Sequence, residues 1–210
     1  MDFVSWVRQQ DPSRLKYLDE SHFENWGNLY VHLFAQNCMH VCFADCSRWQ
    51  YCRGPRGQRV TRTRHMSEAA RTSFSVTYMT SLTHPRGGVL LSIREGSNDA
   101  IDYFESLVDA CHNNHLREGD ILVVDNAKIH GAAQVADLQN MLFAVVGVTS
   151  IRVPAYFPEL MPPELVFQNV KRYMRAHRGF GTFREEILRG FACGTCLEFV
   201  ARQYRMCIPQ

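Results

Sequence analysis

The feature that most constrains this fold is a short apolar run that ends in an acidic residue. Ile121–Val124 consists only of Ile, Leu and Val, and Asp125 follows directly. A continuous apolar run of this length is typical of a strand that is buried on both faces of a parallel sheet. Because open α/β sheets place their functional groups at the carboxyl ends of such strands, we expect Asp125 to contribute a carboxylate to a site there.

Two further acidic residues stand at the ends of predicted elements. Asp19 follows a predicted strand at 15–18, and Glu164 lies in the first turn of a predicted helix that opens with two prolines. Carboxylate oxygens are the ligands that Mg²⁺ and Mn²⁺ prefer. We therefore predict that Asp19, Asp125 and Glu164 are catalytic and together hold two divalent metal ions. The alternative for each acid alone is a helix cap or a surface carboxylate.

Hydrophobic periodicity predicts the other elements. They are strands at 74–79, 89–93 and 150–153, and helices that begin at Ser97 or Asn98, after 130, at 162–163 and at Thr182. This order predicts an α/β fold in which a mixed five-stranded sheet is flanked by helices. Residues at about 24–70 do not fit the pattern, and we expect them to form an insertion after the first strand of a single domain that spans 1–210.

The three acids lie in sequence blocks that resemble those of a known enzyme family. The blocks are Leu-Asp-Glu-Ser at 18–21, Val-Val-Asp-Asn-Ala-Lys-Ile-His at 123–130 and Pro-Ala-Tyr-Phe-Pro-Glu-Leu-Met-Pro-Pro-Glu at 154–164. In this order they resemble the catalytic domain of Tc1/mariner-type DDE transposases, from about residue 15 to about residue 177. The resemblance implies a ribonuclease-H-like fold and an enzyme that cleaves DNA and transfers its strands by a two-metal mechanism.

Basic and polar residues near these blocks indicate contacts with DNA. Six arginines and no acid occur from Arg48 to Arg64, and guanidinium groups bind phosphates bidentately. The resemblance implies that this Gly-rich basic segment and the residues after Asp125 face the nucleic acid. The predicted nucleic-acid-binding residues are Arg53, Arg56, Arg59, Asn126, Lys128, His130, Lys171, Arg172 and Arg175. The alternative for each group is an ordinary solvated loop or helix surface.

Two residues depart from the family pattern Ser-Pro-Asp-Leu-Asn-Pro-x-Glu. Phe157 stands where Ser is usual, and Met161 stands where Asn is usual, which removes a polar group close to Glu164. About 18 residues precede Asp19, so the helix-turn-helix region of such transposases is expected to be absent. A second hypothesis is therefore a domesticated derivative that binds DNA or has a structural role without catalysis. A third is a ribonuclease-H-like nuclease that acts on another nucleic acid.

The bulk composition excludes a membrane-spanning class and says little about partners. The chain has 210 residues, 46% of them hydrophobic, with a formal net charge of +2. Its longest apolar stretch, 141–148, is too short to span a bilayer, and no signal peptide is recognisable. We expect a nuclear protein whose partner is double-stranded DNA, with homodimer formation left open. The eight cysteines are expected to be reduced; Cys193 and Cys196 have the spacing of zinc ligands or of one helix face.

Overall fold

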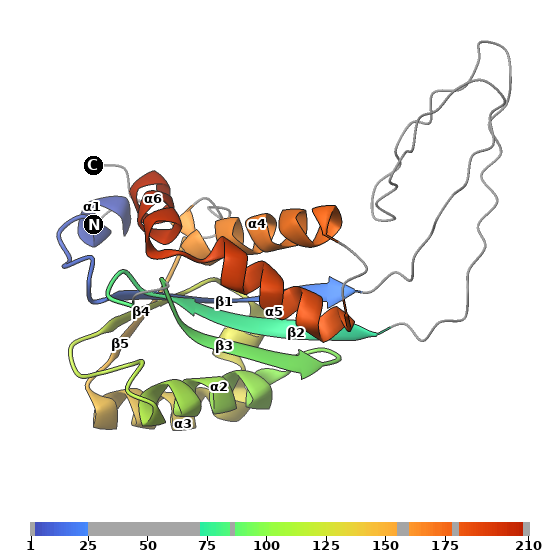
Figure 1. Ribbon diagram of the computed structural model, residues 1–210. Helices are drawn as coiled ribbons and strands as arrows, with labels where there is room; N and C mark the ends of the chain where they lie inside the picture. The colour runs from blue at the N-terminus through green and yellow to red at the C-terminus, as the bar shows by residue number, and fades with distance from the viewer. Residues whose placement is uncertain (1–2, 25–71, 85–86, 155–159, 178–180, 208–210) are drawn as a thin grey trace, which may run out of the picture. The chain divides into compact units, whose positions relative to one another are not determined.

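The structure is a computed structural model that describes residues 3–24, 72–84, 87–154, 160–177 and 181–207. Its elements are α1 (Phe3–Val7), β1 (Leu15–Glu24), β2 (Ser73–Thr80), β3 (Gly88–Glu95), α2 (Ala100–His112), β4 (Ile121–Val124), the 3₁₀ helix η1 (Lys128–Gly131), α3 (Ala133–Val146), β5 (Thr149–Arg152), α4 (Pro162–Ala176), α5 (Phe183–Gly194) and α6 (Leu197–Cys207). One five-stranded sheet has the order β3-β2-β1-β4-β5 (Figure 1), which confirms the predicted α/β architecture. The insertion predicted at about 24–70 lies outside the described residues, apart from Glu24.

The register of the two central strands places two of the predicted acids at the same level. β1 and β4 run parallel, and Leu18 pairs with Val124. Asp19 and Asp125 are the next residues of the two chains, so both follow this pair at one edge of the sheet. β5 runs parallel to β4, whereas β3 runs antiparallel to β2. The sheet is therefore mixed, and its parallel part brings these two acids together without any contribution from loops.

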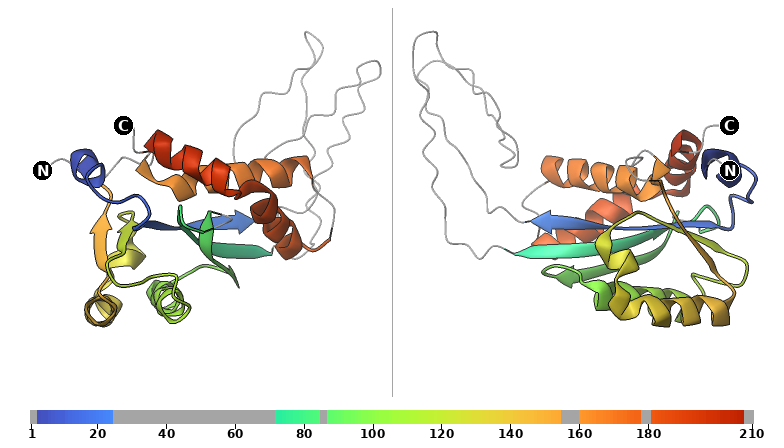
Figure 2. Two further views of the ribbon diagram at one scale, coloured as in Figure 1. Left: turned by 60° about the vertical axis from the view of Figure 1, so that its left-hand side comes forward. Right: turned by 180° about the vertical axis from the view of Figure 1, so that it is seen from behind.

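Helices cover both faces of the sheet. Figure 1 shows α4, α5 and α6 on one face and α2 and α3 on the other, and the view from behind in Figure 2 shows the same layers. Because successive strand residues point to opposite faces, Tyr17 is buried in the core beneath α4, α5 and α6, and Leu18 in the core above α2 and α3. The same alternation decides the directions in which the polar residues after Leu18 point.

Local sequence signals explain where the helices begin. α5 begins after Thr182, which forms the predicted capping box with Glu185. α2 begins after Asp99, whose carboxylate accepts two backbone hydrogen bonds from the first turn. Asn98, one of the two predicted caps, instead donates its amide to the Thr77 hydroxyl at 2.8 Å. The start of α2 was therefore predicted one or two residues too early, because a neighbouring polar side chain has a tertiary partner.

Two described helices, α1 and α6, were not predicted from the sequence. α6 packs its buried face, which includes Val200 and Tyr204, onto the sheet, and the Tyr204 hydroxyl donates to the Leu15 carbonyl at 3.1 Å. α5 ends at Gly194, so the two cysteines at 193 and 196 do not share a helix. Both thiols are free and exposed, and the described residues offer no group of zinc ligands around them.

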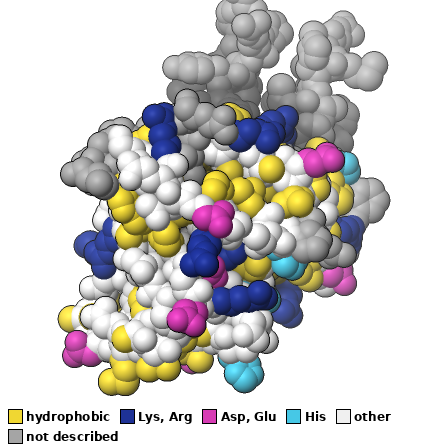
Figure 3. Space-filling view, turned by 90° about the vertical axis from the view of Figure 1, so that its left-hand side faces the viewer, with side chains coloured by type: hydrophobic (Ala, Val, Ile, Leu, Met, Phe, Trp, Pro, Cys, Tyr) yellow, Lys and Arg dark blue, Asp and Glu magenta, His cyan; other side chains and the backbone are white. Residues whose placement is uncertain are grey.

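The described surface is chemically mixed. On the face seen in Figure 3, acidic and basic side chains are interspersed with hydrophobic ones. None of the described helices is both long enough and apolar enough to cross a membrane.

Candidate active site

Three predicted acids come from three different elements of the fold. Asp19 lies on β1 and is 7% exposed, and Asp125 follows β4 and is partly exposed. Glu164 is in the first turn of α4, where an acidic side chain is favoured by the helix N-terminus. The pKa of the Asp19 carboxyl is raised to about 8, first by burial and then by the negative charges of Asp125, Glu20 and Glu164. The acids are therefore close enough to repel one another.

A buried histidine links two carboxylates on the face of β1 that is opposite to Asp19. Strand alternation points Glu20 away from Asp19, toward the core that contains α2 and α3. There the His130 side chain, which is 0% exposed, has Nε2 at 2.7 Å from Glu20 Oε2 and Nδ1 at 2.7 Å from Asp125 Oδ1. Its ring also packs on Tyr103, with 4.5 Å between the ring centroids. Glu20, His130 and Asp125 thus form a continuous bridge from β1 to the end of β4.

The charges of this bridge are mutually dependent. Burial alone would lower the pKa of His130, but hydrogen bonds to Asp125 and Glu20 outweigh it and raise the pKa to about 10. Burial would likewise raise the pKa of Asp125, yet the hydrogen bond from His130 and the backbone N–H of Ala127 lower it overall. An imidazolium that donates from both nitrogens to two carboxylates follows from these shifts. Asp125 is therefore kept ionised in a fixed orientation.

The residues after Asp125 differ from their predicted role in DNA contact. His130 is buried with both ring nitrogens engaged, so it is not available to DNA, and that prediction is corrected here. Asn126 donates its amide to the Val153 carbonyl, which ties the end of β4 to the segment after β5. Lys128 is exposed on η1, where contact with DNA stays a prediction.

A lysine on α4 reaches toward the acids from the other face of the sheet. Lys171 Nζ donates to Ser21 Oγ at 2.8 Å and lies 5.0 Å from the centroid of the Phe23 ring. Burial lowers the pKa of Lys171, while the negative charges of Glu164 and Asp19 act to raise it. This lysine therefore supplies positive charge beside the acids. Its neighbours Arg172 and Arg175, also predicted to bind DNA, are exposed on the same helix.

The donor chemistry of the acids fits a divalent metal ion. Hard carboxylate oxygens suit Mg²⁺ or Mn²⁺, and the raised pKa of Asp19 reports an excess of negative charge that a cation would relieve. Within the described ranges, however, no three His, Cys, Asp or Glu side chains are arranged so that they could hold one ion. The joint binding of two ions by Asp19, Asp125 and Glu164 therefore stays a prediction.

Sequence reasoning missed two residues that shape this site. Glu20 completes the histidine bridge, and the Arg152 guanidinium donates to the His130 carbonyl at 3.3 Å and helps to lower the pKa of Asp125. The available signal for Glu20 was its position directly after Asp19 on a strand, which sends the two side chains to opposite faces. Arg152 had no local signal. The predicted DNA contacts Arg53, Arg56 and Arg59, and the departure at Phe157, lie outside the described residues.

The other departure from the family pattern, Met161, has a structural role. Met161 occupies the N-cap position of α4, makes no side-chain capping bond and is 2% exposed in the core beneath α4, α5 and α6. An asparagine there would gain about 1 kcal/mol as a cap, whereas removing a buried Met costs about 2–5 kcal/mol. Met161→Asn should therefore lower the free energy of unfolding by about 1–4 kcal/mol.

Urea denaturation of the Met161→Asn variant measures this change. Met141→Asn on α3 is the matched control, since Met141 is 64% exposed and should change stability little. A stabilised Met161→Asn variant would show that the cap outweighs the lost packing.

Substituting His130 by Gln or by Asn tests the histidine bridge, because each amide side chain keeps one of its two hydrogen bonds. Gln at position 130 retains a donor near the Nε2 position that faces Glu20, and Asn retains one near Nδ1 that faces Asp125. We expect His130→Asn to leave Glu20 unpaired and to lose about 1–3 kcal/mol of stability. His130→Gln should instead free Asp125 and impair cleavage more than His130→Asn does. Parallel stability and nicking assays check this, and the opposite ranking in activity would contradict the assigned roles.

Comparisons with known proteins identify the family and the fold. Residues 41–186 match the family model of the DDE superfamily endonucleases, a range that contains Asp125 and Glu164 but not Asp19. The fold is that of a DDE-type catalytic domain, as expected from the resemblance to Tc1/mariner transposases. The chain belongs to the DDE superfamily endonuclease family. No curated protein matches the chain.

Solved structures of a mariner transposase share the fold. A pre-cleavage Mos1 transpososome superposes with a TM-score of 0.65 at 15% identity, covering 98% of this chain and 56% of that one. The Mos1 mariner paired end complex with Mn gives 0.63 at 16% identity, with 98% and 56% covered. The catalytic domain of Mos1 mariner transposase gives 0.60 at 14% identity, with 98% and 82% covered. The chain spans little more than half the length of the first two relatives.

Proposed function

We propose that this chain is a catalytic domain of a mariner-like transposase that cleaves DNA and transfers its strands. In this proposal Asp19, Asp125 and Glu164 hold two Mg²⁺ or Mn²⁺ ions, double-stranded DNA is the partner and the nucleus is the place of action. Membership in the DDE endonuclease family supports the reaction class. Among the similar Mos1 structures, one paired end complex is with Mn and another is with Mg. A single domain with an insertion at about 24–70, and a possible second copy of the chain as partner, belong to the same proposal.

The observation that carries this proposal is the paired placement of Asp19 and Asp125. Their position after Leu18 and Val124 on adjacent parallel strands is fixed by the sheet. Burial and the nearby acids then raise the pKa of Asp19. Buried acids that serve only the structure are normally paired with cations. Acids placed together at a cost in free energy therefore indicate a functional site that uses their combined charge.

The chain's own residues orient the acids. His130 holds Asp125 from one side, and Asn126 fixes the start of the following loop to the segment after β5. On the other face, Lys171 supplies a cation beside Asp19 and Glu164 that can meet a DNA phosphate. When bound, two divalent ions make the attacking oxygen more basic and compensate the charge on the leaving oxygen.

The test is cleavage by the intact chain. Supercoiled DNA incubated with the protein and Mn²⁺ should be nicked, and Mn²⁺ or Mg²⁺ should raise the melting temperature of the protein, since a ligand that binds only the folded state stabilises it. The second candidate function is a transposase-derived DNA-binding protein without catalysis, which the buried apolar Met161 favours. Absence of both nicking and metal-induced stabilisation, under conditions in which DNA is bound, would replace the first function by the second.

A further inference from the structure

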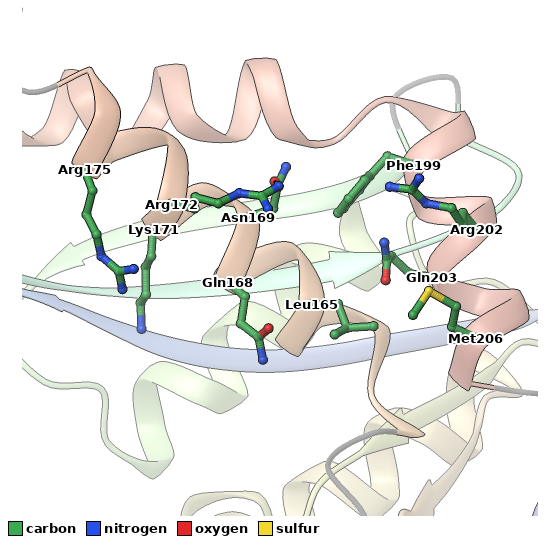
Figure 4. Close-up of a pocket in the computed structure, with 10 residues that line it drawn as sticks. All are labelled: Leu165, Gln168, Asn169, Lys171, Arg172, Arg175, Phe199, Arg202, Gln203 and Met206. Carbon is green, nitrogen blue, oxygen red and sulfur yellow. The ribbon is translucent and has the colours of Figure 1, made fainter.

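A groove of about 650 Å³ lies between α4 and α6. Figure 4 shows Arg172 and Asn169 of α4 extending toward Phe199 of α6, whereas Lys171 and Arg175 point toward β1. Four of the residues that line the groove are cations, and none of the lining residues is acidic; the cations are Lys171, Arg172, Arg175 and Arg202. The lining thus differs from the face seen in Figure 3, where acidic and basic side chains are interspersed. A groove lined in this way attracts an anionic ligand.

The side-chain amide of Gln203 points into this groove. Gln203 is 5% exposed and lines the groove, where Figure 4 shows its side chain directed toward α4. An amide that borders a groove can donate and accept hydrogen bonds there, to water or to a bound ligand. The groove therefore offers a hydrogen-bonding group as well as positive charge.

The α6 side of the groove also provides a flat surface. The Arg202 guanidinium lies over the Phe199 ring, with its carbon 5.6 Å from the ring centroid. Leu165 and Met206 add apolar area to the lining. A guanidinium plane backed by an aromatic ring is a surface on which nucleic-acid bases stack. Contacts with a duplex backbone require only surface cations, whereas this hollow also has apolar and amide groups that suit an exposed base.

We propose that the α4–α6 groove binds an unpaired DNA strand. Arg172 and Arg175 contact its phosphates, a base stacks on the Arg202–Phe199 pair, and the Gln203 amide bonds to the edge of a base. Lys171 joins the groove to the acids, because it lines the groove while its Nζ donates to Ser21, two residues after Asp19. The strand in the groove would thus continue toward the acids. The choice of DNA rests on the proposed function, but binding does not require cleavage.

The experiment measures binding in EDTA, so that no cleavage can occur. Fluorescence anisotropy compares a blunt duplex, the same duplex with a short single-stranded overhang, and oligo(dT). Arg202→Ala and Gln203→Met should each weaken binding of the overhang substrate and of oligo(dT) by about tenfold. Binding of the blunt duplex should change by less than about twofold. Arg189→Ala is the matched control, since Arg189 lies on α5 outside the groove and is exposed.

Stability separates a ligand site from a structural contact. Because the Gln203 amide borders the groove and Met has a similar size, Gln203→Met should change the melting temperature little. Equal losses for blunt and overhang substrates would make the groove a duplex-backbone surface and overturn the proposal. Unchanged binding of all three probes would also overturn it and would favour another anionic partner, such as an acidic peptide. If the wild-type chain never nicks DNA but the variants still lose binding of the overhang substrate, the groove proposal stands and the proposed function is wrong.

Discussion

Replacing Asp125 with asparagine should lower metal-dependent DNA cleavage by at least about a thousandfold while leaving DNA binding nearly unchanged. Asparagine has the shape of the aspartate, and its carbonyl oxygen can still accept the hydrogen bonds that His130 and the Ala127 N–H donate to Asp125 Oδ1. It lacks the negative charge that would hold a divalent ion. The variant therefore separates the electrostatic role of Asp125 from its role in the local structure.

Nicking of supercoiled DNA in Mn²⁺ measures the loss of cleavage, and fluorescence anisotropy in EDTA measures binding. Asp137→Asn makes the same chemical change at an exposed position on α3 and should leave both activities intact. Cleavage by Asp125→Asn within about tenfold of the wild-type rate would remove Asp125 from the proposed metal site. Loss of binding together with cleavage would instead indicate that the substitution disturbs the fold.

The parts of the fold that follow from local patterns were predicted correctly. β4 was recognisable because four apolar residues end at Asp125, and the start of α5 because Thr182 and Glu185 form a capping box. Both signals depend only on residues within one element. Asp19 and Asp125 could be placed at the same sheet edge because parallel strands align their carboxyl ends, and the register of β1 with β4 has this arrangement.

The parts that depend on distant contacts were missed. His130 and Glu20 are 110 positions apart, so the bridge between them has no local signature, and His130 was assigned to DNA instead. The α4–α6 groove exists only because α6 packs beside α4, and α6 was not predicted. Its first residues follow two cysteines whose i, i+3 spacing suggested one continuous helix, whereas α5 ends between them. Sequence periodicity does not report which exposed faces meet after folding.

The buried Asp19 should make the metal-free protein less stable as the pH rises. Its pKa is about 8 in the folded protein, against an ordinary value of 3.8 for an exposed aspartate, so between these values the folded state binds a proton that the unfolded state has lost. The contribution of Asp19 to the free energy of unfolding is fully present below about pH 3.8. It falls by about 1.4 kcal/mol per pH unit as the pH rises from there to about 8. The exposed acids with lowered pKa values, Asp11 and Glu185, act below this window. His130, whose pKa is about 10 when folded, loses its contribution only above about 6.5.

Asp19→Asn should therefore be more stable than the wild type by about 3 kcal/mol at pH 6 in EDTA, with little difference near pH 4. Asparagine resembles the protonated carboxyl and cannot ionise. The free energy of unfolding of the variant therefore lacks the decline that ionisation of Asp19 causes between pH 4 and pH 6. Urea denaturation at several pH values measures the difference, and Asp137→Asn should follow the wild-type curve. Saturating Mn²⁺ should reverse the order, because the ion stabilises the ionised Asp19 and has less to bind in the variant. Parallel pH profiles for wild type and Asp19→Asn would contradict the burial of an acid beside Asp125 and Glu164, and with it the site on which the proposed cleavage depends.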